Sequence, residues 1–379
     1  MSTDTDIYRA LQQHLDAQAI GFPPVKSGAD IRLLKRLFAP DEAKLALHLS
    51  YRTASTHDVV KLAEAEFPAE QAERLLESMF KKGSIGWKKK DGLDRWYLMP
   101  MVVGMYEQQD GNPSKEFLVD ADAYMKTLAF GRSFLNVKPS QMRTIPIGKS
   151  IPVEHHVASY DQVRDLVGGS TGPFVVLPCI CRKSKEMKGK PCAKTHREDT
   201  CLAFGDMAAS VLRRGHGREI GREEVLAVLQ KNEEDGLVLQ PSNTRQAEFV
   251  CSCCGCCCGM LSFQKFMPRP LDFWSSNFHA EVASEACSQC GTCVDRCQVN
   301  AIALDGPSGE ARVNSERCIG CGLCVTTCPS DAIRLQQRVK AAVPPLNEEE
   351  LLDEIKANKK GPVGQMQTVA RVAIDKMKE

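Results

Sequence analysis

The chain has 379 residues, and its 49 Lys and Arg against 48 Asp and Glu give a formal net charge of +1. This balance argues against a strongly basic nucleic-acid binder and against an acidic solvating tail. Its 43% hydrophobic and 26% charged residues are ordinary for a globular protein of two or three domains, whereas its 18 cysteines are not.

The first 178 residues contain no cysteine and are predicted to begin with helices and a hairpin. Apolar spacing predicts helices at residues 41–52, 58–66 and 69–82, the second capped by Thr56 and the third opened by Pro68. Asp91 and Gly92 then form a hairpin turn signal. Three helices followed by a hairpin resemble a winged-helix domain, so we expect a winged-helix-like scaffold domain at residues 1–105.

Such domains often bind DNA through the third helix, which here contains Glu70, Glu73 and Glu77. Acidic groups on a helix that reads a groove would meet phosphate repulsion. The hairpin lysines 88–90 are more typical of a solvated face. We therefore expect this region to assemble with other proteins, with DNA binding as the alternative.

Residues 106–275 are predicted to form a cysteine-rich α/β domain. The expected elements are helices at 159–167 (with Ser159 as its cap), 201–212 and 222–231, and strands at 172–178, 236–239 and 247–250. Both central groups of cysteines directly follow a predicted strand, and ligands bind at that edge of α/β sheets. If the strands are parallel neighbours, ten thiols meet at one edge. His155 and His156 precede this region as candidate ligands or proton donors, although paired histidines more often have structural roles.

The first central group is expected to bind a third iron–sulfur cluster, with a four-thiolate zinc site as the alternative. It consists of Cys179, Cys181, Cys192 and Cys201. The second group is a candidate fourth iron–sulfur site whose ligand subset the spacing leaves open. It consists of Cys251, Cys253, Cys254, Cys256, Cys257 and Cys258.

The segment 182–197 is rich in Lys and Arg, and cations stabilise an anionic thiolate-ligated cluster. It is also a candidate docking patch for an acidic electron carrier or an anionic substrate, with a solvated face as the alternative. The docking residues would be Arg182, Lys183, Lys185, Lys188 and Lys190.

The spacing C-x2-C-x2-C-x3-C occurs twice, beginning at Cys287 and again at Cys318. In this pattern three cysteines wrap one [4Fe–4S] cluster and the fourth ligates the neighbouring cluster. Zinc motifs more often pair two C-x2-C units. The predicted ligands are Cys287, Cys290, Cys293 and Cys328 for cluster A, and Cys318, Cys321, Cys324 and Cys297 for cluster B.

These stretches resemble the bacterial two-cluster ferredoxins over residues 284–335, including the apolar strands 301–304 and 332–335. We expect a ferredoxin-like domain at residues 280–340, followed by a helical tail at 341–379. One departure is Gln298, which stands where the family usually has proline.

The central motifs, with the CxCR segment at 179–182 and the loop 251–258, resemble a family of bacterial and archaeal 4Fe–4S dicluster binding proteins. In that family Asn often occupies the position of Ser252. The resemblance extends over most of the chain. It implies an anaerobic electron-transfer role, but it names no reaction.

We therefore expect an α+β multidomain protein that relays single electrons between a two-cluster ferredoxin module and one or two further central clusters. It would be an oxidoreductase component, working with redox partner proteins or as a subunit of an anaerobic enzyme complex, and no catalytic residue is identified. The alternatives are a self-contained reductase with its substrate site at 251–258, and a redox-sensing DNA-binding regulator.

No Gly-rich nucleotide motif follows a strand, so no nucleotide cofactor is expected. The apolar run 173–180 falls short of the ~20 residues that span a bilayer, and the first residues do not resemble a secretory signal. We therefore expect a cytoplasmic protein, with neither a membrane span nor a nucleic-acid partner, whose cysteines bind metal rather than form disulfides.

Overall fold

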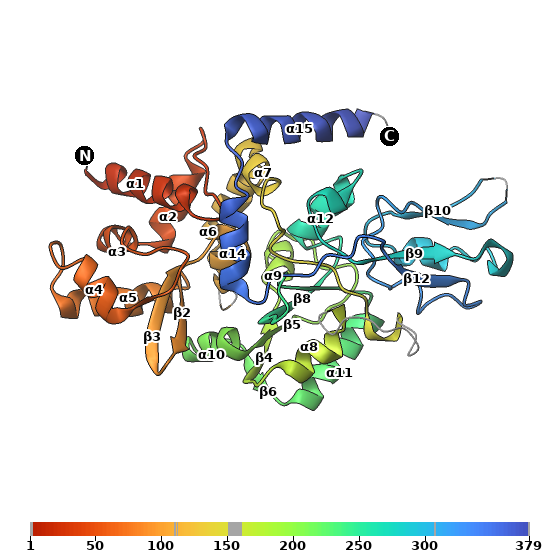
Figure 1. Ribbon diagram of the computed structural model, residues 1–379, viewed down its shortest axis with the longest axis horizontal. Coiled ribbons are helices and arrows are strands. Elements are labelled where there is room, and N and C mark those ends of the chain that lie inside the picture. The colour runs from red at the N-terminus through yellow and green to blue at the C-terminus, as the bar shows by residue number, and fades with distance from the viewer. Residues whose placement is uncertain (1–2, 110, 112, 151–160, 307, 378–379) are drawn as a thin grey trace. The chain divides into compact units, whose positions relative to one another are not determined.

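The computed structural model describes residues 3–109, 111, 113–150, 161–306 and 308–377 (Figure 1). His155, His156 and Ser159, which the sequence singled out, lie outside these residues. The chain divides into two compact units, Met1–Lys138 with Asp206–Gly217 and Leu352–Val369, and Pro139–Gly205 with Arg218–Leu351 and Ala370–Glu379. Both units contain helices and strands, which confirms the α+β class. Among the described helices, none combines the length and apolarity that crossing a membrane requires.

The first unit is built from helices around a small antiparallel sheet. Its helices are α1 (Thr3–Ala17), α2 (Ala29–Leu37), α3 (Pro40–Ala46), α4 (Thr56–Leu62), α5 (Ala69–Lys81), α6 (Lys115–Met125), α7 (Leu128–Phe134) and most of α10 (Gly205–Arg213). Its strands β1 (Ala54–Ser55), β2 (Ile85–Lys90) and β3 (Leu93–Leu98) lie in the order β1-β3-β2. The tail helices α14 (Glu348–Ala357) and α15 (Pro362–Met377) each contribute residues to both units.

The predicted hairpin is confirmed, and its turn uses the residue types that the backbone needs. Asp91 and Gly92 both have positive φ, 54° and 76°, and join β2 to β3 as a two-residue turn. Helix α5 begins after Pro68, as expected. The cap of α4 is Ser55 rather than Thr56: its Oγ accepts from the N–H of Asp58 at 3.1 Å. The Thr56 hydroxyl instead accepts from an indole N–H.

Helix α3 ends at Ala46, earlier than the sequence predicts. Beyond that residue the N–H groups reach back three residues instead of four, as in the bond from Leu47 to the carbonyl of Lys44 at 3.1 Å. Tightening of this kind is common in the last turn of a helix and accounts for the shorter span.

The second unit contains a five-stranded sheet in the order β6-β4-β5-β8-β7. Its strands are β4 (Phe174–Pro178), β5 (Asp199–Phe204), β6 (Arg218–Ile220), β7 (Val238–Pro241) and β8 (Phe249–Cys253). Helices α8 (Val163–Gly169), α9 (Ile180–Glu186), α11 (Arg222–Glu234) and α12 (Gly259–Phe266) belong to the same unit.

Two sequence expectations about this sheet are corrected. Every pairing in it is antiparallel, so the strands are not parallel neighbours. Residues 201–204, predicted as the start of a helix, belong to strand β5, because this segment pairs with a strand on each side. Helix α10 begins only at Gly205, whose φ of 53° turns the chain out of the strand.

Residues 278–337 contain strands β9 (Phe278–Val282), β10 (Ile302–Leu304), β11 (Ala311–Val313) and β12 (Ile333–Gln337), and the short helix α13 (Thr292–Arg296). Strand β9 pairs with β12, and β10 with β11, so the strands expected near 301–304 and 332–335 are confirmed. This segment belongs to the same compact unit as the five-stranded sheet. The segment before Gly148 contacts both parts: the N–H of Ile145 donates to the carbonyl of Leu239 in β7 at 3.2 Å, and the N–H of Ile147 donates to the carbonyl of Cys321 at 3.0 Å.

Candidate metal centres

The ten central cysteines gather because antiparallel strands present their ends at a shared edge of the sheet. Strand β4 ends just before Cys179, and Cys201 lies near the start of its neighbour β5, opposite Leu177. On the other side of β5, Leu202 faces Val250, so the next step of the ladder brings Cys201 beside Cys251. The thiols thus meet at one edge, but through a different strand arrangement from the one predicted.

Six of these cysteines form a closed ring of thiols, which we call the six-thiol ring. Each thiol interacts with two others of the set, and these interactions run in one circuit. In circuit order, the ring consists of Cys179, Cys181, Cys258, Cys253, Cys251 and Cys201.

Ionisation in this ring is unequal. Hydrogen bonds from Cys179 and Cys251 hold the pKa of Cys201 well below its usual value. Hydrogen bonding to neighbouring thiols, together with burial, raises the pKa of Cys251 and of Cys253 well above the usual value for a cysteine. The six sulfurs can all ionise only if a cation neutralises them, and sulfur is the donor that iron and zinc sites use. The donor set fits a thiophilic metal centre.

The remaining four central cysteines form a second, separate cluster, which we call the four-thiol group: Cys192, Cys254, Cys256 and Cys257. All four sulfurs lie within 4.8 Å of one another. The sulfur of Cys256 lies 3.4 Å from that of Cys254, 3.7 Å from that of Cys257 and 3.7 Å from that of Cys192. A hydrogen bond from Cys257 and the field of Arg182 outweigh the effect of burial and, with smaller contributions from Cys256 and Cys192, bring the pKa of Cys254 down to about 5.

This division differs from the grouping by sequence spacing, which placed Cys192 with Cys179, Cys181 and Cys201. Between the end of α9 and the start of β5, the chain forms a loop that brings Cys192 to Cys254 instead, at 3.6 Å between the sulfurs. Sequence spacing could not predict that Cys192 lies beside Cys254, because this contact depends on the path of a loop without regular secondary structure.

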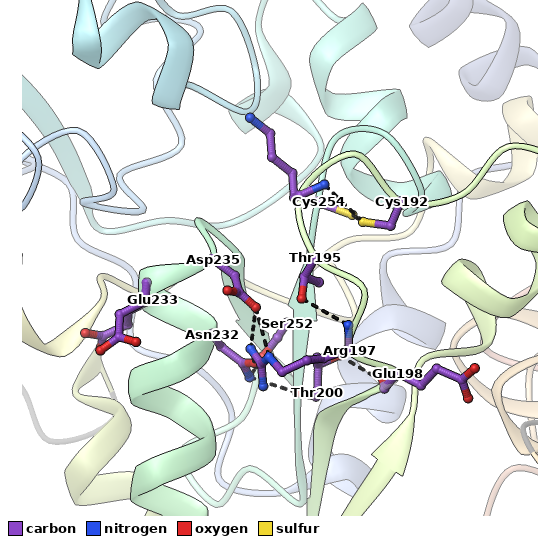
Figure 2. Close-up of polar contacts among 12 residues, drawn as sticks. Cys192, Thr195, Arg197, Glu198, Thr200, Asn232, Glu233, Asp235, Ser252 and Cys254 are labelled. Atoms are coloured by element: carbon purple, nitrogen blue, oxygen red, sulfur yellow. Dashed lines mark hydrogen bonds and ion pairs between the residues drawn. The ribbon is translucent and has the colours of Figure 1, made fainter.

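A partly buried polar network holds the end of that loop (Figure 2). The guanidinium of Arg197 donates to Asp235 at 2.6 and 2.9 Å and to Asn232 at 2.8 Å. The fully buried Asn232 amide donates in turn to the carbonyl of Thr200 at 2.9 Å and to the hydroxyl of Ser252 at 2.7 Å. The network therefore ties the loop to β5 and β8, the two strands that contain ring cysteines. Asn232 is a positioning residue that the sequence analysis missed.

Arg182 lies beside both thiol clusters. It is 4% exposed and donates to the carbonyl of Ser252 at 2.9 Å and to the hydroxyl of Thr200. Burial lowers its pKa, but the attraction of thiolates in both clusters, Cys179 and Cys254 first, raises it well above the ordinary value. Its candidate role in docking is therefore corrected, because a buried guanidinium offers no surface to a partner. Of the other candidate docking residues, Lys188 and Lys190 are exposed and Lys183 and Lys185 are half-buried.

The eight C-terminal cysteines come together in two sets of four, each with one member from the other repeat. Cys287, Cys290, Cys293 and Cys328 line one pocket. In the second set, the thiols of Cys318, Cys321 and Cys324 all lie within the electrostatic reach of Cys297. These are the two sets that the repeat spacing predicted as ligands.

The two sets also receive matching backbone hydrogen bonds. The N–H of Ala301 donates to the sulfur of Cys297 at 3.1 Å, and the N–H of Ala332 donates to that of Cys328 at 3.3 Å. In the same way, the N–H groups of residues 280 and 311 donate to the sulfurs of Cys318 and Cys287. Such N–H···S bonds stabilise ligand thiolates and raise the reduction potential of a cluster they hold.

Gln298 connects the ferredoxin-like segment to the four-thiol group. Its side chain is 4% exposed, accepts from the N–H of Gly255 at 2.9 Å and donates to the carbonyl of Gly236 at 3.1 Å. Gly255 lies between Cys254 and Cys256, and a Cβ there would come 2.7 Å from the Gln298 carbonyl oxygen. The departure from proline at this position thus places an amide where the two segments contact each other.

The comparisons with curated proteins and with solved structures give no match to this chain. A family model does match, over the segment that contains both C-terminal sets of four cysteines and the strands β9 to β12 around them. Residues 280–335 match the family described as a 4Fe-4S dicluster domain.

Proposed function

We propose that this chain is an iron–sulfur electron-transfer protein that holds two [4Fe–4S] clusters in residues 280–335 and at least one further cluster at the six-thiol ring. The observation that supports this most directly is the exchange of the fourth cysteine between the two sets, Cys328 to the first and Cys297 to the second. This exchange places two clusters side by side, each able to pass one electron at a time.

The residues around the two sets support a role in electron transfer. Backbone N–H groups of residues 280, 301, 311 and 332 donate to four of the eight sulfurs. Cys290 is exposed, whereas Cys318 and Cys324 are buried. An electron carrier would therefore approach the first cluster, and the second would lie deeper in the protein.

The six-thiol ring supports a further cluster by its composition. All six donors are sulfur, and the buried guanidinium of Arg182 lies within their field. A fixed positive charge favours the reduced, more negative state of an anionic cluster. The ring and the ferredoxin-like segment belong to one compact unit, which supports electron exchange between them.

The remaining features support assembly with a redox partner. The exposed Lys188 and Lys190 suit an acidic surface on an electron carrier. In the first unit, the order α3-β1-α4-α5-β2-β3 with sheet order β1-β3-β2 supports a winged-helix-like scaffold, whose proposed role is assembly within a larger oxidoreductase. Glu70 and Glu73 on α5 are exposed and disfavour DNA.

Anaerobic quantification of iron and acid-labile sulfide, combined with EPR, tests the cluster content. Two cubane clusters contribute about 8 iron per chain, and a third centre at the ring raises this to about 12 or more. Cys201→Ser is expected to remove the additional iron while leaving the EPR signals of the two ferredoxin-type clusters. An iron content of about 8 that this variant does not change would contradict a cluster at the ring. Absence of a reducible EPR signal in the wild type would contradict electron transfer altogether.

A further inference from the structure

The four-thiol group has a different geometry from a [4Fe–4S] site. Its sulfur separations are 3.4 Å for Cys254–Cys256, 3.6 Å for Cys192–Cys254, and 3.7 Å for both Cys192–Cys256 and Cys256–Cys257. The remaining pairs lie within 4.8 Å. In a cubane cluster each thiolate binds a different iron at a different corner, which sets the sulfurs about 6 Å apart.

Four thiolates around one ion lie much closer together. With a metal–sulfur distance of about 2.3 Å, the edge of a regular tetrahedron is about 3.8 Å. The observed separations match this edge and leave no space for a four-iron core between the sulfurs. Tetrahedral coordination by four sulfurs is typical of zinc.

We propose that Cys192, Cys254, Cys256 and Cys257 bind a single zinc ion, at a site distinct from every iron–sulfur centre of this chain. The proposal does not rest on the electron-transfer function, because it follows from the sulfur positions alone.

The surroundings of the group suit a tetrathiolate ion, which has a net charge of −2. The N–H of Lys194 donates to the sulfur of Cys192 at 3.4 Å, and the N–H of Ala193 donates to that of Cys256. Arg182 adds a buried positive charge within reach of Cys192 and Cys254. Hydrogen bonds and cations of this kind stabilise the ligand thiolates of a zinc site.

Such an ion has a structural role. Four protein ligands fill the tetrahedral shell, so no position is open for water or substrate, and zinc does not change its oxidation state. The ion would link the loop that contains Cys192 to the turn 254–257, while the Arg197 network holds the other end of the loop. The exposed lysines 188 and 190 would thereby be presented on a fixed loop.

Metal analysis of the anaerobically purified full-length protein, expressed with added zinc, tests this assignment. We expect one zinc per chain in addition to iron. Cys192→Ser is expected to lose the zinc and keep the iron and sulfide, whereas the matched variant Cys201→Ser is expected to keep the zinc and lose iron. Wild-type protein without zinc, or a Cys192→Ser variant that loses iron and sulfide instead, would overturn the proposal.

Two measurements do not depend on that variant. Zinc-edge X-ray absorption of the wild type is expected to show four sulfur neighbours at about 2.3 Å. Nitrogen or oxygen neighbours, or a mononuclear iron signal in place of zinc, would overturn the assignment. In the second measurement, zinc chelation is expected to speed tryptic cleavage after Lys188 at least several-fold without changing the iron content. An unchanged cleavage rate after the zinc has left would contradict the role in holding the loop.

Discussion

Replacing Gln298 by alanine removes the only side chain that hydrogen-bonds to both Gly255 and Gly236 within the described part of the chain. The amide is 4% exposed, so the partners it leaves are poorly placed to find water. Leaving a buried donor or acceptor unpaired costs about 1–3 kcal/mol for each group. Leaving both groups unpaired is therefore expected to destabilise the contact between Gln298 and the two glycines by about 2–6 kcal/mol. The upper end of this range is reached only if no water enters.

The contact is local, so hydrogen exchange is a sharper measurement than global unfolding. In Gln298→Ala, amides of residues 254–258 are expected to exchange at least about thirty times faster, because the lower bound of about 2 kcal/mol corresponds to that factor when each 1.4 kcal/mol is tenfold. The control Gln336→Ala changes an exposed residue of β12 and is expected to leave these amides unaffected. Unchanged exchange at 254–258 in Gln298→Ala would refute the inference that this glutamine holds the thiol-containing turn.

Three further predictions concern charged residues. Arg182→Met is expected to lower the reduction potential of the central cluster by about 100 mV, because a unit charge at about 7 Å and an effective dielectric constant of about 20 is worth ~2 kcal/mol. Arg182→Lys keeps the charge and is expected to lower the potential much less. An EPR redox titration of the two variants measures the difference. Arg213→Ala removes a guanidinium that lies 4.3, 4.9 and 5.4 Å from the centres of three aromatic rings and pairs with an acid on α5. We expect the free energy of unfolding to fall by about 1–3 kcal/mol, measured by the change in tryptophan fluorescence on unfolding. Burial raises the pKa of Asp120, but hydrogen bonds and attraction from Arg32 and Arg36 outweigh it and bring the pKa below the usual value. Its stabilising effect is therefore fully present above about pH 4 and lost as the pH falls through the lowered pKa, so the melting-temperature deficit of Asp120→Asn at pH 7 is expected to shrink below pH 4.

The two C-terminal sets of cysteines could be grouped from sequence because the grouping depends on short spacings. Three ligands of each set lie within seven residues of one another, and an internal repeat supplies the crossing fourth, so the local chain determines most of the geometry. The hairpin at Asp91 and Gly92 was predictable for the same reason, since both residues tolerate the positive φ that its turn requires.

The central site could not be grouped in this way because its contacts depend on long-range register. Cys201 and Cys251 are fifty residues apart in the sequence. They meet only because β5 and β8 pair antiparallel with Leu202 opposite Val250. Residues 201–204 were predicted as the start of a helix, and pairing with a strand on each side makes them part of β5 instead. Sequence spacing identified the candidate metal ligands, but not which of them share a site.

Arg182 explains why the two central thiol clusters occur as neighbours. Within the described residues no carboxylate forms an ion pair with it, and a buried guanidinium without a counter-charge is strongly unfavourable. Its counter-charge is therefore on sulfur, in the six-thiol ring through Cys179 and Cys201 and in the four-thiol group through Cys192 and Cys254. A zinc tetrathiolate would keep the same charge in every redox state, whereas a cluster in the ring would gain an electron on reduction. The four-thiol group would then be a fixed negative charge beside Arg182 that offsets part of its effect on the ring, so loss of the zinc is expected to shift the reduction potential of the central cluster without removing any of its ligands.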